Sequence, residues 1–140
     1  MMIKFTLLGK PIAQPRQRHA VRGGHAVSYM PKDHPIHGFK LAIQNVAYCE
    51  IDKLIEGPVC LSLVFVMPRP KGKIWKRKPM PRYLHTSTPD ADNLAKAVMD
   101  ALNGIAYKDD SQVCQLRVEK WVAGGDEMPH IDVEIGEISV

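Results

Sequence analysis

The sequence lacks paired cysteines. Its three cysteines, Cys49, Cys60 and Cys114, are widely spaced, and no Cys-x-x-Cys pair is present. This spacing argues against a zinc site or a disulfide framework and favours reduced thiols in a cytosolic protein. No apolar run approaches the roughly 20 residues that a membrane span requires, and the first ten residues lack the apolar core of a signal peptide. We therefore expect a soluble cytoplasmic protein with no membrane partner.

Several motifs that identify an enzyme class are also missing. The chain has no Walker phosphate loop, so no nucleotide cofactor is expected, and no calcium-binding loop of the EF-hand type. His34 and His37 lack the glutamate and the spacing of a zinc-protease helix. Neither a helix-turn-helix nor a zinc-finger pattern is present, so a DNA partner is more simply recognised by its backbone or shape than by its bases.

The length and charge of the chain narrow the choice further. A chain of 140 residues fits one domain, residues 1–140, that can bury a core without disulfides or metal staples. Its net charge of +4 and its pI of about 9.0 favour a polyanionic partner.

Apolar spacing and turn residues predict a small mixed β-sheet with two main helices packed on it, an α/β (α+β-like) fold in the order β-(hairpin)-α-β-α-β-β. The predicted elements are a strand over 2–9, a loop or short hairpin over 12–30 turned at Gly23-Gly24, a helix over 36–55, a strand over 59–67, a helix from 92 or 93 to 103, and strands over 112–123 and 130–138. The proline-rich stretch 68–89 is expected to form no regular element.

The acidic residues that stand out surround the second helix. Asp90 and Asp92 stand at its start, and Asp109 and Asp110 follow about one helix length later. In an extended chain residues i and i+2 share a face, so the first two carboxylates can point the same way. The helix carries the chain away by roughly 16 Å, and an extended segment 105–110 can return by up to roughly 20 Å. We therefore expect Asp109 or Asp110 to lie near Asp90 and Asp92.

This set of carboxylates, without histidine or cysteine, suits Mg²⁺ or Mn²⁺ rather than zinc. Taken singly, Asp92 and Asp109 are well explained as a helix cap and a turn residue. Lys96, one turn after Asp92, has two interpretations that spacing does not separate. It can form a surface ion pair with Asp92 or Asp100, or it can contact a scissile phosphate and stabilise its charge.

Basic residues gather in two loops, where binding residues often collect. Such runs are usually solvated, but Trp75 lies within the longer one and can stack on a base, and this loop runs directly into the acidic helix. The longer loop contains Arg69, Lys71, Lys73, Lys76, Arg77, Lys78 and Arg82, and the group near the N-terminus contains Arg16, Arg18, His19, Arg22 and His25. We interpret the basic residues of the longer loop, together with Arg16 and Arg18, as candidate DNA-binding residues that contact phosphates.

The stretch from Pro89 to Gly104, followed by 107–113, resembles the RusA family of Holliday junction endonucleases, which phages and prophages often encode. The resemblance rests on an Asp-x-Asp-Asn-Leu-x-Lys helix and an Asp-Asp-x-Gln turn at the proper distance from it. The first strand and the Arg16/Arg18 loop resemble the family more loosely. The resemblance implies that Asp90, Asp92 and Asp110 bind metal, that Asp109 accompanies them, and that Lys96 is an essential lysine. It gives Asp100 no definite role.

The resemblance also implies a homodimer that makes paired nicks in four-way DNA junctions with Mg²⁺ or Mn²⁺, in DNA recombination and repair. The proposed chemistry is metal-assisted phosphodiester hydrolysis, with Asp90, Asp92, Lys96 and Asp110 as the catalytic residues. Because a four-way junction is nearly two-fold symmetric, a two-fold dimer would place one site on each of two opposed strands. Two alternatives remain open: a non-catalytic junction-binding protein, and a less selective nuclease that cuts flaps or forks.

Overall fold

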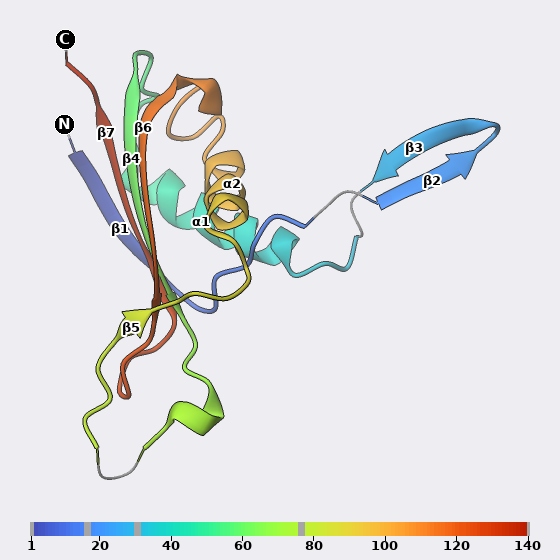
Figure 1. Cartoon of the computed structure of the whole chain (residues 1–140). Coiled ribbons are helices and arrows are strands. Elements are labelled where there is room, and N and C mark those ends of the chain that lie inside the picture. The colour runs from blue at the N-terminus through green and yellow to red at the C-terminus, as the bar shows by residue number, and fades with distance from the viewer. Residues whose placement is uncertain (1, 16–17, 30–31, 76–77, 140) are drawn as a thin grey trace.

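The computed structural model describes residues 2–15, 18–29, 32–75 and 78–139, and its main elements follow the predicted order (Figure 1). They are β1 (Met2–Leu8), β2 (Arg18–Arg22), β3 (His25–Tyr29), α1 (Ile36–Glu50), β4 (Val59–Met67), the short 3₁₀ helix η1 (Lys71–Lys73), β5 (Tyr83–Leu84), α2 (Ala91–Ala101), the 3₁₀ helix η2 (Asp110–Gln112), β6 (Val113–Val122) and β7 (His130–Glu137).

Five strands form a mixed sheet in the order β1-β7-β4-β6-β5. The pair β4 and β6 is parallel, whereas the other neighbours are antiparallel. Parallel strands need a crossover connection, and here α2 supplies it. The helix therefore runs opposite to both strands, and its first turn lies at the edge of the sheet where β4 and β6 end (Figure 1). The predicted mixed α/β architecture is confirmed.

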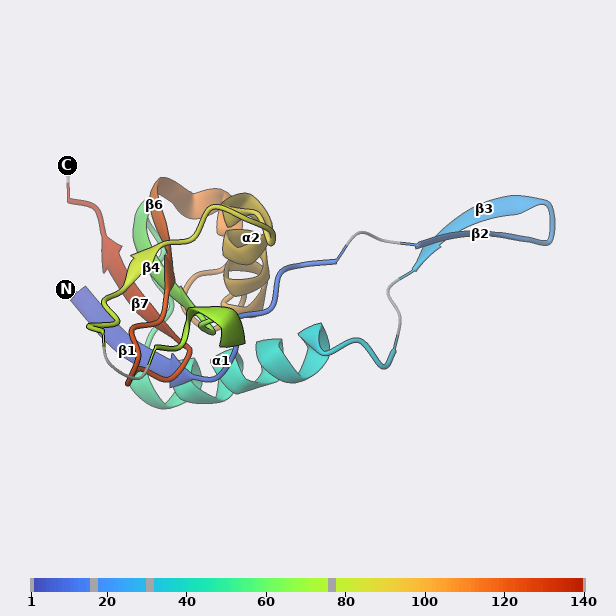
Figure 2. The ribbon, with the colours of Figure 1, turned by 60° about the horizontal axis from the view of Figure 1, so that its bottom comes forward.

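Both helices cover one face of the sheet, with α1 packed against β1 and α2 beside β6 (Figures 1 and 2). The buried residues of α2 form one stripe, Leu94, Ala95, Ala97, Val98 and Ala101. This stripe and the inward residues of β4 build the core, because alternate strand residues and helical i, i+3, i+4 residues each share a face. No helix of the described residues is long and apolar enough to cross a membrane.

The first helix is shorter than predicted. It ends at Glu50 instead of residue 55, and Ile51 already has extended backbone angles (φ −116°, ψ 115°). Ile55 is buried, but it pairs with Tyr107 across an isolated bridge, and its amide donates to the Ala106 carbonyl at 2.8 Å. The apolar spacing beyond Glu50 therefore reflects burial of an extended segment against the turn that follows α2.

The 12–30 region contains the predicted hairpin. Strands β2 and β3 pair across Gly23-Gly24, and both glycines have positive φ (59° and 81°), as a two-residue hairpin turn of the primed type requires. Figure 2 shows the hairpin extending away from the sheet and helices.

The prediction that 68–89 forms no regular element is wrong in two places. Lys71–Lys73 forms η1, and Tyr83–Leu84 forms β5, which pairs with Val122 and Trp121 at the end of β6. The prolines of this region flank both short elements without interrupting them, so the backbone amides that these elements need remain available.

A candidate active site along one face of helix α2

Two carboxylates stand at the start of α2. Asp90 directly precedes the helix with extended backbone angles (φ −74°, ψ 150°), and its exposed side chain makes no capping hydrogen bond. Asp92 lies in the first turn, is also exposed, and accepts a hydrogen bond at Oδ1 from the Asn93 amide at 2.9 Å. Because Asp90 rather than Asp92 precedes the helix, the prediction that α2 begins at 92 or 93 is corrected by one or two residues. Both carboxylates keep oxygen atoms that face solvent.

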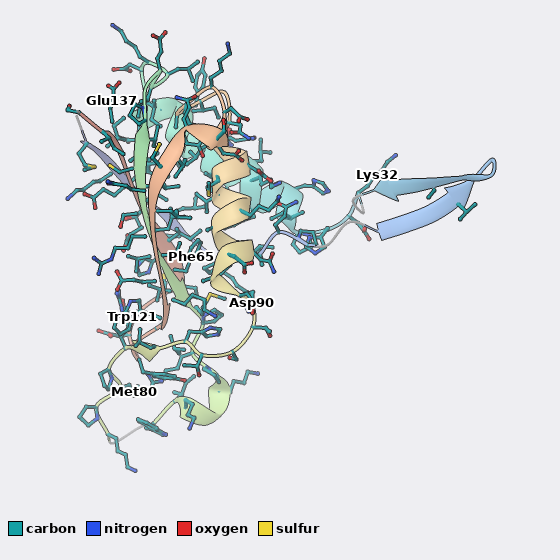
Figure 3. The ribbon with its side chains drawn as sticks, turned by 45° about the horizontal axis from the view of Figure 1, so that its top comes forward. Lys32, Phe65, Met80, Asp90, Trp121 and Glu137 are labelled. Atoms are coloured by element: carbon teal, nitrogen blue, oxygen red, sulfur yellow. The ribbon has the colours of Figure 1, made fainter. Side chains whose placement is uncertain are left out.

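The start of α2 lies beside the loop from β5 and the segment after β1 (Figure 3). Asp90 lies at the end of the helix that follows the loop from β5 (Figure 3). The carboxyl ends of parallel strands, here those of β4 and β6, are a common place for ligands to bind in α/β sheets. The Gln14 amide donates to the Asn93 carbonyl at 3.0 Å, so the segment that leads to the N-terminal basic group is fastened to the first turn of α2.

The exposed face of α2 continues from these carboxylates. Asp92 and Lys96 are exposed, while Met99 and Asp100 are half-buried, and these four lie on the side opposite the buried stripe. Asn103, just after the helix, is also exposed. Among the described residues, no ion pair joins Lys96 to a carboxylate, so the surface-pair interpretation of this lysine gains no support. Lys96 stands about one turn, or roughly 6 Å along the axis, from Asp92 and from Asp100.

A second acidic group lies at the far end of α2. The carboxyl of Asp110 is hydrogen-bonded to that of Asp100, and burial followed by this contact raises the pKa of Asp110. The negative charge of neighbouring Asp109 acts in the same direction, while a hydrogen bond from Asn103 opposes the shift. Lys40 of α1 approaches Asp100, with 3.7 Å between Nζ and Oδ2. Two carboxyl groups in contact share a proton or attract a cation, because two bare charges at that distance repel.

The expectation that Asp110 lies beside Asp90 and Asp92 is wrong within one chain. Eight residues of helix separate Asp92 from Asp100, about 12 Å at 1.5 Å per residue. Figure 1 shows the chain after α2 turning into β6 at the end opposite to the start of the helix. Among the described residues, no three His, Cys, Asp or Glu side chains gather closely enough to hold a metal ion.

The physical reason is that the chain after α2 folds into compact turns and does not run back extended. Gly104, with a positive φ of 79°, donates to the Tyr107 carbonyl at 2.8 Å, and the Ala106 amide donates to the Leu102 carbonyl at 3.0 Å. Tyr107 is fully buried, and its hydroxyl donates to the Met99 carbonyl at 2.8 Å. The segment is thereby held at the C-terminal end of the helix.

Asp109 and Asp110 are adjacent but differently placed. Asp109 caps η2: its Oδ2 accepts from the Ser111 amide at 3.1 Å, and the hydrogen bonds from Ser111 lower the pKa of Asp109. Its carboxylate is therefore used by the turn, in agreement with the turn-residue interpretation. Asp110 is the residue that faces Asp100 and Asn103.

Gln112 belongs to the Asp-Asp-x-Gln motif, but the sequence analysis assigned it no role. Its Oε1 accepts from the amides of Lys108 and Asp109 at 2.9 and 3.0 Å. Its Nε2 donates to the carbonyls of Ile55 and Gly57 at 2.7 and 3.0 Å. The glutamine of the Asp-Asp-x-Gln turn thus joins η2 to the segment after α1 and holds Asp110 in place.

The two described arginines of the long basic loop make their contacts within the fold. Arg69 donates from Nε to the Lys73 carbonyl at 2.7 Å and from Nη1 to the Pro81 carbonyl at 3.0 Å, and its guanidinium lies 5.0 Å from the centroid of the Trp75 ring. Arg82 forms a bidentate ion pair with Glu127: its Nε donates to Oε1 at 3.0 Å and its Nη2 donates to Oε2 at 2.6 Å. These contacts favour a structural role for Arg69 and Arg82 over the predicted DNA contact, and they occupy the Trp75 ring.

The lysines of the same loop are placed differently. Lys71, Lys73 and Lys78 are exposed, and their positive charges are available to an anion, although Lys78 also lies 5.7 Å from the Trp75 ring. Three of the other candidate DNA-binding residues, Arg16, Lys76 and Arg77, lie outside the described residues. Arg18 is the first residue of β2, and its side chain is likewise outside the described part of the chain.

Comparison with known proteins identifies the family of the chain. The family model described as endodeoxyribonuclease RusA matches residues 9–136, nearly the whole chain. A protein of Bacillus subtilis (strain 168), described as the uncharacterized protein YqaN, is 38% identical over 143 residues, which cover 98% of this chain and 97% of that protein. The family indicates a Holliday junction endonuclease, a hydrolase that acts on branched DNA. The chain, matched by the family model along almost its entire length, belongs to the RusA endodeoxyribonuclease family.

Proposed function

We propose that this protein resolves four-way DNA junctions by paired, metal-dependent phosphodiester hydrolysis, in the cytoplasm and in the service of recombination and repair. The observation that supports this most directly is the alignment of Asp92, Lys96 and Asp100 along the side of α2 opposite its buried stripe, with Asp90 and Asp110 at the two ends. The exposed Asp92 and Lys96 of this side contribute little to folding, because the opposite face of α2 supplies the core.

The donor atoms at both ends of this face fit Mg²⁺, with Mn²⁺ as a substitute. Carboxylate and amide oxygens are the ligands that these cations prefer. The contact between Asp100 and Asp110 supports the fit, because a cation would relieve the repulsion between two ionised carboxylates in contact. When bound, the metal would polarise the scissile phosphate and activate a water molecule for attack.

The chain itself supplies positioning and charge. Lys96 stands between the two acidic groups, where its ammonium can contact a phosphate oxygen and stabilise the extra negative charge of the transition state. Lys71, Lys73 and Lys78 can hold the DNA backbone at a distance from the cleaved bond, where they add affinity without sequence preference. Lys40, which approaches Asp100, limits the negative charge at the far end of α2 when no cation is bound.

The separation of the two acidic groups makes a homodimer the natural unit. If two copies associate about a two-fold axis so that the start of α2 in one copy lies beside the end of α2 in the other, Asp92 of one copy approaches Asp110 of the other and Lys96 stays open to DNA. Such a pairing completes two equivalent sites, as a symmetric junction requires. In this arrangement a single copy supplies only part of the carboxylates of each site.

Mixed dimers test this arrangement. Asp92→Asn and Asp110→Asn are each expected to lose cleavage of a synthetic four-way junction. If each site draws Asp92 from one copy and Asp110 from the other, mixing the two variants restores one intact site per mixed dimer, and nicks reappear. If both residues act within one copy, every mixed dimer stays inactive and the shared-site arrangement is wrong.

The same variants separate the enzyme from a junction-binding protein. Asp92→Asn should abolish nicking at any Mg²⁺ concentration and leave junction affinity within about three-fold, because it removes a metal ligand and no phosphate contact. Asp52→Asn, an exposed aspartate in the loop after α1, is the control. A wild-type protein that binds but never nicks, or an Asp92→Asn variant that cuts normally, rules the proposal out. Equal cutting of flaps, forks and junctions identifies a less selective nuclease.

A further inference from the structure

The segment 85–89, which leads into Asp90 and α2, is hydrogen-bonded to one lysine of the sheet, Lys120. Lys120 lies on β6 opposite Phe65 of β4, a fully buried core residue. Its Nζ donates to the Ser87 carbonyl at 2.8 Å and to the Pro89 carbonyl at 2.7 Å. Pro89 is the residue before Asp90, so the ammonium is attached to the backbone at the point where the catalytic helix begins.

The backbone of Lys120 holds the other end of the same segment. Its carbonyl accepts from the His85 amide at 2.9 Å, next to the pairing of β5 with β6. Residues 85–89 are thereby fastened to one sheet residue at both ends. Burial, and then the nearby charge of Lys120, lower the pKa of His85, so the imidazole stays neutral and adds no second positive charge.

The charge of Lys120 is otherwise out of place in the fold. Its side chain is half-buried, and no ion pair among the described residues involves it. A cation beside the start of a helix is opposed by the positive end of the helix dipole. The two carbonyl hydrogen bonds of the ammonium offset part of this cost, and the negative charges of Asp90 and Asp92 at this end of α2 offset it further.

We propose that Lys120 is a positioning residue for junction cleavage: its two hydrogen bonds fix the backbone before Asp90, and so set where the Asp90 and Asp92 carboxylates meet metal and phosphate. The predicted effect of Lys120 on the cleavage rate rests on the proposed function. Its effect on the position of the Asp90 and Asp92 carboxylates does not require DNA, because the Lys120 contacts lie within one chain.

Replacement by methionine is the direct perturbation. Lys120→Met keeps the length and the apolar stem of the side chain, but removes the donor and the charge. Because misplacement of reacting groups by about 1 Å can cost on the order of 100-fold in rate, single-turnover cleavage of a four-way junction should fall by roughly 10- to 100-fold. Junction affinity should change by less than about three-fold, since the phosphate-binding lysines are elsewhere.

Two further variants separate positioning from general stability. Lys120→Arg restores both a donor and a charge and should recover much of the lost rate. Lys53→Met removes an exposed lysine of the loop after α1 and should leave both rate and affinity unchanged. If Lys120→Arg is as inactive as Lys120→Met while both are folded, or if Lys120→Met cleaves at the wild-type rate, Lys120 is not a positioning residue.

A measurement without DNA keeps the test separate from the proposed function. Mn²⁺ affinity, followed by electron paramagnetic resonance, should weaken in Lys120→Met by about the same factor as cleavage, and the amides of residues 90–93 should exchange hydrogen faster. If wild-type protein cuts no junction, the proposed function fails, and these two readouts still decide the inference. Unchanged Mn²⁺ affinity together with unchanged exchange overturns it. If Lys120→Met does not fold, Lys120→Arg with normal exchange and affinity supports it, and altered values in that variant contradict it.

Discussion

Gln112 offers the sharpest test of how the fold positions Asp110. Gln112→Ala removes four hydrogen bonds, two from the amides of Lys108 and Asp109 and two to the carbonyls of Ile55 and Gly57. Water can replace the bonds to the two exposed amides, so their loss costs little. The two bonds to partly buried carbonyls contribute about 1 kcal/mol each. The expected loss is therefore about 2 kcal/mol, or roughly 8 °C in Tm for a domain of this size.

The assay is thermal unfolding followed by circular dichroism, with cleavage measured in parallel. Gln115→Ala is the matched control, because Gln115 is an exposed glutamine on β6, three residues after Gln112, and should tolerate the change within about 0.5 kcal/mol. Cleavage should fall more steeply in Gln112→Ala than junction binding does, since Asp110 loses its support. Equal Tm values for the two variants would refute the reasoning.

A charged residue at position 112 gives a second test, in which the direction of the pH dependence of stability is predicted. Gln112→Glu sets a carboxylate against the carbonyls of Ile55 and Gly57, so the charged form is disfavoured and the pKa of the new carboxyl is raised in the folded state. The destabilisation should thus be largest at neutral pH and should shrink as the pH falls and the carboxyl becomes protonated. A stability difference that does not change between pH 7 and pH 4.5 contradicts this account.

Further predictions concern contacts away from the acidic residues. Tyr107→Phe leaves the Met99 carbonyl without its donor and should lower Tm by roughly 4 °C, or about 1 kcal/mol, whereas exposed Tyr48→Phe should have no effect on the same melting curve. The Arg82 ion pair lowers the pKa of Glu127 from 4.5 to about 2. Glu127→Gln should therefore lower Tm by a few degrees above about pH 4.5, and the difference should vanish as the pH falls toward 2, which melting curves across this range will show.

The parts of the fold that were predictable from the sequence are those whose pattern is local. Alternation over Val59–Met67 and the stripe of apolar residues in Ala91–Ala101 each identify a buried face without knowledge of the partner. The end of the first helix was not predictable in this way. Ile55 continues a helical spacing, but it is buried in an extended bridge to Tyr107, a residue 52 positions away. Periodicity shows that a side chain is buried, and not what buries it.

The same distinction applies to the candidate site. The placement of Asp92 and Lys96 on one side of α2 follows from helical spacing alone, and Asp90 directly precedes the helix. The position of Asp110 depends on turns that are stabilised by burial of Tyr107 and by the long-range hydrogen bonds of Gln112. An estimate from chain reach gives only the largest distance that a segment can cover. It therefore allowed a single cluster of carboxylates where the fold makes two groups.

The basic loop shows why charge in a sequence is an uncertain guide to DNA contact. Arg69 and Arg82 present planar donor groups that satisfy carbonyls and a carboxylate at fixed geometry, whereas the exposed lysines are flexible point charges. Neutralising Lys73 and Lys78 together should therefore lower the slope of log affinity against log salt by up to about 1.8, near 0.9 for each phosphate contact. Arg69→Lys should leave that slope unchanged and lower Tm, because a single ammonium nitrogen cannot reproduce the donors that the guanidinium directs at the Lys73 and Pro81 carbonyls. If the slope falls with Arg69→Lys and not with the lysine changes, Arg69 contacts the DNA and the division between structural arginines and phosphate-binding lysines is wrong.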